Sequence, residues 1–240
     1  MIGLREMGAS HWKQMLLGSG TGDAEARASA LRGAVVSAPS RAEALEALAE
    51  LAGDTTLKPF DRVVALLAVS TAAAVTGLPL PDAAFAAVED SALIDEALRR
   101  GSSGAVTGVL GRAPAGDDYR ALRQLVARRL LAAGERGMHV TSLLIDAGDY
   151  ARAVDAAVDD FVDNVQSAGD PLLGQAWAAQ SIRWMADHEE EVFAPLVAAL
   201  AARQPGAPAA LADLIARARG VDPALAGAAI GTLRRQGERN

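Results

Sequence analysis

Cysteine is absent from all 240 residues of the chain. Without a thiol the protein forms no disulfide bond and has no thiolate nucleophile, and it cannot bind iron–sulfur clusters or zinc through cysteine. This absence suits a reducing compartment, and we expect a cytoplasmic location. The three histidines, His11, His139 and His188, lie far apart in the sequence. None has a second histidine at a metal-ligand spacing, so a zinc or di-iron site is not expected.

Aromatic residues are also scarce, at 4% of the chain, although 51% of the residues are hydrophobic. The core must therefore consist mostly of Ala, Leu and Val, and Ala has the highest helix propensity of all residues. No apolar run approaches the ~18 residues of a membrane span. Residues 1–10 lack the apolar stretch of a secretory signal. We expect a protein that is neither embedded in a membrane nor secreted by an ordinary signal.

Positive charge is in deficit, because 23 Lys and Arg residues stand against 30 Asp and Glu residues. The net charge of -7 opposes attraction to phosphate backbones and to anionic lipid. Arginines gather between residues 112 and 136, but they lack the pattern of a recognition helix. We therefore expect no nucleic-acid partner.

Helix starts and stops are abundant. Ser40 and Glu43 have the spacing of a capping box, and apolar residues recur after them at helical intervals until Gly53. Another helix should open at Pro59 and close at Gly77; it is apolar around most of its surface, so we expect it to be central. Segments of this kind joined by short loops predict an all-α fold: an irregular bundle or stacked antiparallel helical hairpins, with roughly a dozen helices.

The segment 101–116 is unusually rich in glycine. Such a segment is typical of a crossover or a boundary. We expect one helical domain over residues 1–240, with a possible lobe boundary near 101–116. Further along, the turn 147–150 resembles the hairpin turn of a tetratricopeptide repeat, although no second copy follows. Pro195 falls inside an apolar run and should kink or divide the helix there.

Asp159, Asp160 and Asp163 form a DDxxD string on a predicted helix. Carboxylates four residues apart lie on one helix face, where they can share Mg²⁺ ions bound to a diphosphate. The string resembles the first metal motif of class I terpene synthases and prenyl diphosphate synthases, and the resemblance would make Asp159 and Asp163 metal ligands. The competing interpretation, which we favour, places the acids on a solvated face opposite apolar residues.

A second set of residues lies on one predicted helix further along. Trp177, Ser181, Trp184 and His188 fall on one face, with Gln180 beside them. They could form a ligand pocket, because small-molecule sites are apolar with a few polar groups. We favour core packing, since Trp is the largest side chain available to fill an alanine-rich core.

We therefore expect a non-catalytic helical interaction, adaptor or regulatory protein that binds a protein partner and needs no cofactor. The alternative is a Mg²⁺-dependent enzyme that acts on a prenyl or terpene-type diphosphate through the acidic helix at Asp159–Asp163. A third possibility is a small-molecule-binding enzyme with a pocket around Trp177 and Trp184. The sequence leaves the partner, the substrate and the oligomeric state open.

Overall fold

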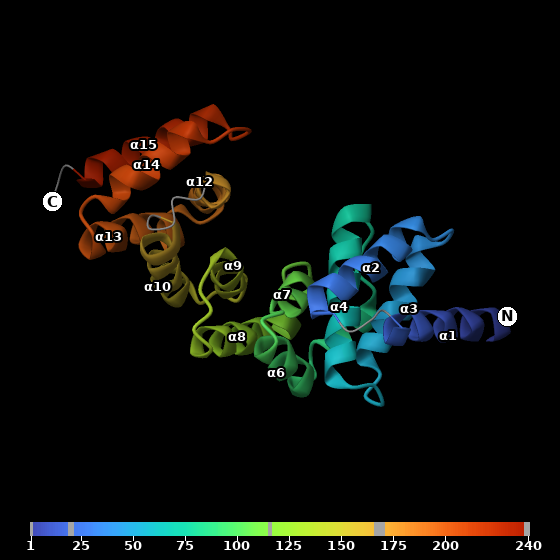
Figure 1. The fold of residues 1–240 in the computed structure, drawn as a ribbon. Coiled ribbons are helices and arrows are strands. Elements are labelled where there is room, and N and C mark those ends of the chain that lie inside the picture. Colours follow the sequence, from blue (N-terminus) through green and yellow to red (C-terminus); the bar gives the residue numbers. More distant parts are fainter. Residues whose placement is uncertain (1, 19–21, 115–116, 166–170, 238–240) are drawn as a thin grey trace. The chain divides into compact units, whose positions relative to one another are not determined.

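The computed structural model describes residues 2–18, 22–114, 117–165 and 171–237. The model is 80% helical, with 14 α-helices and two short π-helices in these ranges (Figure 1). No strand occurs in the part of the chain so described. The prediction of an all-α fold with about a dozen helices is confirmed.

Residues 1–122 and 123–240 form two compact units, and the division falls within helix α8 (Asp117–Ala132). Each unit is described by itself below. The predicted organisation as one domain with a boundary near 101–116 stays a prediction. Part of that glycine-rich segment forms the helix α7 (Gly104–Leu110). This helix packs against α4 (Pro59–Thr76). Gly108 allows this contact, since an added Cβ would collide with the Ser70 side chain.

Helix α4 is the centre of the first unit, as predicted. Every residue from Asp61 to Ser70 is buried, and α4 packs against α2, α3, α6 and α7. By length and composition alone it could cross a membrane, but 67% of it is buried inside the unit, as expected for a core helix. Besides α4 and α7, the unit contains α1 (Ile2–Gly18), α2 (Ala24–Ser37), α3 (Arg41–Gly53), α5 (Asp82–Ala87) and α6 (Ser91–Arg99).

Buried ion pairs at the start of α4 join it to its neighbours. Arg27 of α2 lies 2.9 Å from the Asp61 carboxylate, and both side chains are almost fully buried. Next to them, Arg62 donates to the carbonyl of Ala52 at 2.8 Å and to the Asp90 carboxylate at 2.7 Å. The hydrogen bond from Arg62 holds the pKa of Asp90 below its ordinary value. The sequence analysis did not predict these pairs.

The second unit contains the rest of α8, followed by a series of helices that pack mainly on near neighbours in the sequence. Of its π-helices, η1 directly follows α10 and η2 directly precedes α13. The prediction that Pro195 divides its helix is confirmed, because η2 ends at Phe193 and α13 starts at Ala194. The elements are α9 (Met138–Asp146), α10 (Tyr150–Asp160), η1 (Phe161–Val165), α12 (Pro171–Asp187), η2 (Glu189–Phe193), α13 (Ala194–Arg203), α14 (Ala207–Arg217) and α15 (Pro223–Gly237).

Some helix ends are capped as the sequence predicts, and others are not. Gly77 ends α4 in the left-handed conformation (φ 70°), which glycine adopts without steric cost. Asp90 caps α6 by accepting from the backbone N–H of Ala92 at 2.9 Å. Ser40 stands at the N-cap of α3, but its side chain makes no capping hydrogen bond. The predicted capping box is wrong in that respect.

Candidate functional site

The three acids of the predicted metal motif lie where α10 ends and η1 begins, and their environments differ. Asp160 is buried, Asp159 is half-buried and Asp163 is exposed. The Asp159 carboxylate lies 3.5 Å from Nε of Arg136, so it has a cationic partner. Because the backbone changes from α to π at Phe161, the α-helical spacing assumed for Asp159 and Asp163 does not hold across this point.

Asp160 corrects the expectation that the acids lie together on a solvated face. Only 4% of this residue is exposed. Its Oδ2 accepts a hydrogen bond from Nε1 of Trp177 at 2.6 Å, and its Oδ1 accepts from Nδ2 of Asn164 at 2.9 Å. A buried carboxylate requires such partners, because removal from water penalises its charge. Asp160 therefore ties the end of α10 to α12.

The tryptophan stripe of α12 lies in the core of the second unit. Trp177 and Ser181 are fully buried and Trp184 is 2% exposed. The ring of Trp177 lies 5.2 Å from that of Phe161 and 5.4 Å from that of Trp184, measured between centroids. Such edge and tilted contacts favour aromatic packing. These residues form one aromatic cluster, which we define as Phe161, Trp177 and Trp184.

The polar members of the predicted pocket differ in burial and in their contacts. Gln180 is half-buried. The hydroxyl of Ser181 donates to the backbone carbonyl of Trp177 at 2.9 Å, as is common for serine inside a helix. His188 is half-buried at the start of η2, and its ring lies 5.7 Å from that of Tyr150. A ligand pocket at these residues stays a prediction.

Metal binding also stays a prediction. Among the residues that the structure describes, no group of three or more His, Asp or Glu side chains could hold a metal ion together. Under the enzyme hypothesis, Asp159 and Asp163 would be the ligands of Mg²⁺. The partners of Asp160 are an indole and an amide instead.

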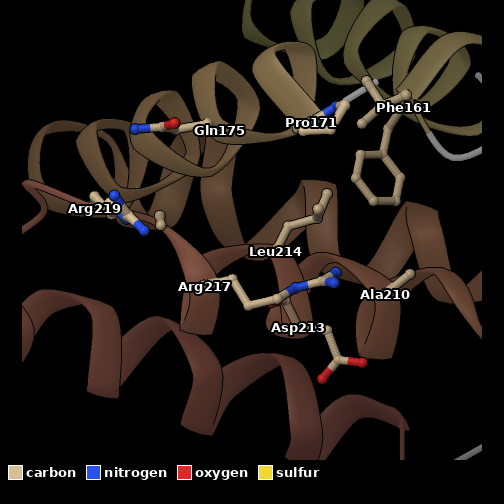
Figure 2. A pocket seen from close by; sticks show the side chains of 11 residues that line it. Phe161, Pro171, Gln175, Ala210, Asp213, Leu214, Arg217 and Arg219 are labelled. Carbon is tan, nitrogen blue, oxygen red and sulfur yellow. The ribbon is translucent and has the colours of Figure 1, made fainter. Parts of the chain in front are cut away.

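A groove of about 650 Å³ lies in the second unit, between the first turn of α12 and one face of α14. Its size is within the range of about 300–1,000 Å³ typical of ligand sites. Figure 2 shows its side chains. Its walls are formed by Phe161, Val165, Pro171, Gly174, Gln175, Ala210, Asp213, Leu214, Arg217, Ala218 and Arg219.

One face of α14 forms the length of the groove. Ala210, Asp213, Leu214 and Arg217 line it at intervals of three and four residues, so they lie on the same side of the helix. At a rise of 1.5 Å per residue, this face is about 10 Å long. Opposite it, Gly174 has no side chain, and an added Cβ would lie 3.0 Å from Cδ2 of Leu214. The groove is therefore short, and Gly174 keeps α12 close to Leu214.

The groove combines apolar side chains with two arginines. Phe161 and Ala210 lie at one end and Arg219 at the other, with Leu214 and Arg217 between them (Figure 2). Phe161 is fully buried, so it forms a wall behind the groove, whereas both arginines are exposed. The Arg217 side chain points back toward Ala210, so its guanidinium group and that of Arg219 lie on opposite sides of Leu214 (Figure 2).

The arginines are available to a ligand. Nε of Arg217 donates to the backbone carbonyl of Asp213 at 3.0 Å, which leaves its two terminal amino groups. Within the described part of the chain, no carboxylate pairs with Arg217 or Arg219. The Asp213 carboxylate points away from α12 (Figure 2). An anionic group on either side of Leu214 would therefore meet a guanidinium group, that of Arg217 or that of Arg219.

This groove was not predicted from the sequence. The signal was the spacing of Ala210, Leu214 and Arg217, which reads as an ordinary amphipathic helix. Which helix faces α14 cannot be read from that spacing. None of the residues predicted for a pocket or metal site lines the groove; Phe161 connects the two, since it lies in the aromatic cluster and at the groove wall.

Comparison with known proteins gives no significant match: no family model, no curated protein sequence and no solved structure resembles this chain at a significant level.

Proposed function

We propose that this chain is a non-catalytic helical interaction protein that binds a protein partner through the groove beside α12 and α14. The groove is the observation that carries the proposal. It combines an apolar wall at Leu214 with the exposed guanidinium groups of Arg217 and Arg219. Arginine is enriched in protein–protein interfaces because its planar group can pair with carboxylates and cover apolar surface.

The contacts of the acidic residues also favour this proposal over the diphosphate enzyme. Asp160 is bonded to Trp177 and Asn164, and Asp159 lies beside Arg136. Both carboxylates thus have partners within the second unit, and these contacts join α10 to other elements. A structural role accounts for them without a metal ion.

Site-specific photo-crosslinking in the source cells tests the proposal. A photoreactive residue at Gln175, on the rim of the groove, should give a discrete protein adduct, because the partner would lie within reach of it. The same residue at Arg183, exposed further along α12 and outside the groove, should not give that adduct. Immunoblotting and mass spectrometry measure the two adducts.

A pair of variants on α14 provides the control. Ala210→Phe places a large side chain in the groove and should abolish the adduct formed from Gln175. Ala209→Phe adds the same ring at the neighbouring exposed position, which does not line the groove, and should leave the adduct intact. An adduct that survives Ala210→Phe in a folded protein would contradict the proposed function.

A further inference from the structure

We infer that the groove takes a short acidic segment of its protein partner: an apolar side chain with a carboxylate within about three residues of it. This inference rests on the proposed function and adds the chemistry of the occupant. It follows from the length of the groove and from the guanidinium groups that lie on either side of its apolar wall at Leu214.

The length of the groove sets the length of the segment. The face of α14 that lines it covers about 10 Å. An extended chain advances about 3.3–3.6 Å per residue, so about three residues of a partner fit along that face. A long amphipathic helix would reach far beyond the groove at both ends. The structure therefore favours a short segment whose few side chains supply the recognition.

The apolar wall at Leu214 selects an apolar side chain. Leu214 is half-buried and points toward α12, between Pro171 and Ala210 (Figure 2). A partner side chain lying on Leu214 would remove its exposed surface from water, at about 25 cal/mol per Å². The buried ring of Phe161 behind it is held by Trp177, so this wall is preformed and rigid.

The two arginines, one on each side of Leu214, select a carboxylate. Arg217 and Arg219 present guanidinium groups with no carboxylate partner among the described residues, and guanidinium binds carboxylate through two parallel hydrogen bonds. The chain as a whole carries a net charge of -7 and repels an acidic partner. Salt screens charges beyond about 8–10 Å, so the charges of the groove lining decide, and among its described residues two arginines stand against one acid, Asp213.

Panning a phage-displayed library of random seven-residue peptides on the full-length protein tests this inference. We expect the enriched peptides to carry Asp or Glu within about three positions of a large apolar residue, since that is the span of the groove. The most enriched peptide is then synthesised with fluorescein, and its binding is measured by fluorescence anisotropy. Replacing its acid by the corresponding amide should weaken binding about tenfold.

Matched charge variants separate the groove from the rest of the surface. Arg217→Glu combined with Arg219→Glu should weaken the acidic peptide about tenfold or more, because like charges then face each other. Arg203→Glu combined with Arg234→Glu changes the net charge equally at exposed positions outside the groove, and should change the affinity less than about twofold. All four positions are exposed, so both double variants should fold.

The outcomes distinguish the inference from the proposed function. If the enriched peptides are neutral or basic and do not bind the Ala210→Phe variant, the acidic segment is refuted, whereas binding in the groove is supported. Peptides that bind the Ala210→Phe protein as well as the unmodified protein, or no enrichment at all, would refute both. If the enriched peptides are acidic and bind the Arg217→Glu, Arg219→Glu variant as tightly as the unmodified protein, the inference is refuted.

Discussion

In the first unit two buried arginines pair with carboxylates, whereas in the second unit the buried Asp160 is bonded to neutral groups. Arg27 lies against Asp61 in the first unit, and Arg62 lies against Asp90. In the second unit, Asp160 accepts hydrogen bonds from an indole and an amide. The stability of the two units should therefore depend on different changes. An ion pair is weakened by a change of pH or by the loss of one partner. An aromatic cluster is weakened when a substitution removes side-chain volume.

The largest expected effect comes from removing the central ring of the aromatic cluster. Trp177→Ala should lower the free energy of unfolding of the second unit by about 3–5 kcal/mol or more, because it leaves a cavity and also removes the hydrogen-bond donor to Asp160. Urea unfolding checks this in a Trp12→Phe background, where Trp177 and Trp184 of the second unit give all the tryptophan fluorescence. In the Trp177→Ala variant, the fluorescence of Trp184 alone follows the unfolding of the second unit.

Trp177→Phe provides the control for that prediction. It keeps most of the ring volume and removes only the donor to Asp160, so the cost should be smaller, about 1–3 kcal/mol. If the Phe and Ala variants are equally unstable, the hydrogen bond rather than packing dominates this site. The contrast between the two units would then largely disappear.

Breaking a buried pair in the first unit should cost nearly as much. Arg27→Met leaves the Asp61 carboxylate buried without its partner and should destabilise the first unit by about 3 kcal/mol. Hydrogen exchange measured by mass spectrometry on peptides of α2 and α4 follows this unit separately. The double variant Arg27→Met with Asp61→Leu should recover most of the loss, since no charge is then buried alone. A double variant as unstable as the single one would contradict this account.

Acid should weaken the first unit through Asp90. Its folded pKa lies below the ordinary value of 3.8 because of the hydrogen bond from Arg62. A lowered folded pKa gives stability that is fully present above 3.8 and is lost as pH falls through the folded value. Thermal unfolding of the first unit between neutral pH and about pH 3 should show this loss. Asp90→Asn should be less stable at neutral pH and less dependent on pH; an unchanged pH profile would exclude Asp90 as the cause.

The smallest effect is expected at Asp159, a half-buried acid of the second unit. Asp159→Asn should change the stability by no more than about 0.5 kcal/mol, because its pair with Arg136 is well solvated. Under the proposed function, Mg²⁺ with inorganic diphosphate should leave the melting temperature unchanged. A ligand at ~100 times its dissociation constant would stabilise by about 2.7 kcal/mol, so a clear shift that Asp159→Asn removes would favour the enzyme instead.

Local sequence patterns predicted the helices well, and they failed where two distant segments meet. The central position of α4 followed from its apolar surface, and its end followed from Gly77. The burial of Asp160 did not follow, since a DDxxD string on a regular helix places its acids together and gives no sign of an indole 17 residues away. The change from α to π at Phe161 had no recognisable signal either.

The groove was beyond prediction for the same reason. In the sequence, Arg217 and Arg219 have the pattern of ordinary solvated residues at the end of a helix. Gly174 has no evident role there, because glycine lowers helix stability. Their significance depends on the approach of α12 to α14, where Gly174 faces Leu214. A spacing along one helix specifies which residues share a face, but not what that face meets.

By itself, the sequence determined the all-α class and the ends of α3 and α4, because these depend on interactions between residues a few positions apart. Only the tertiary structure decided which arginines are buried in pairs, which aspartate bonds to Trp177, and where an apolar wall meets exposed guanidinium groups. Those contacts join residues that are distant in the chain, and their energies depend on burial and distance. Neither quantity exists until the helices have packed.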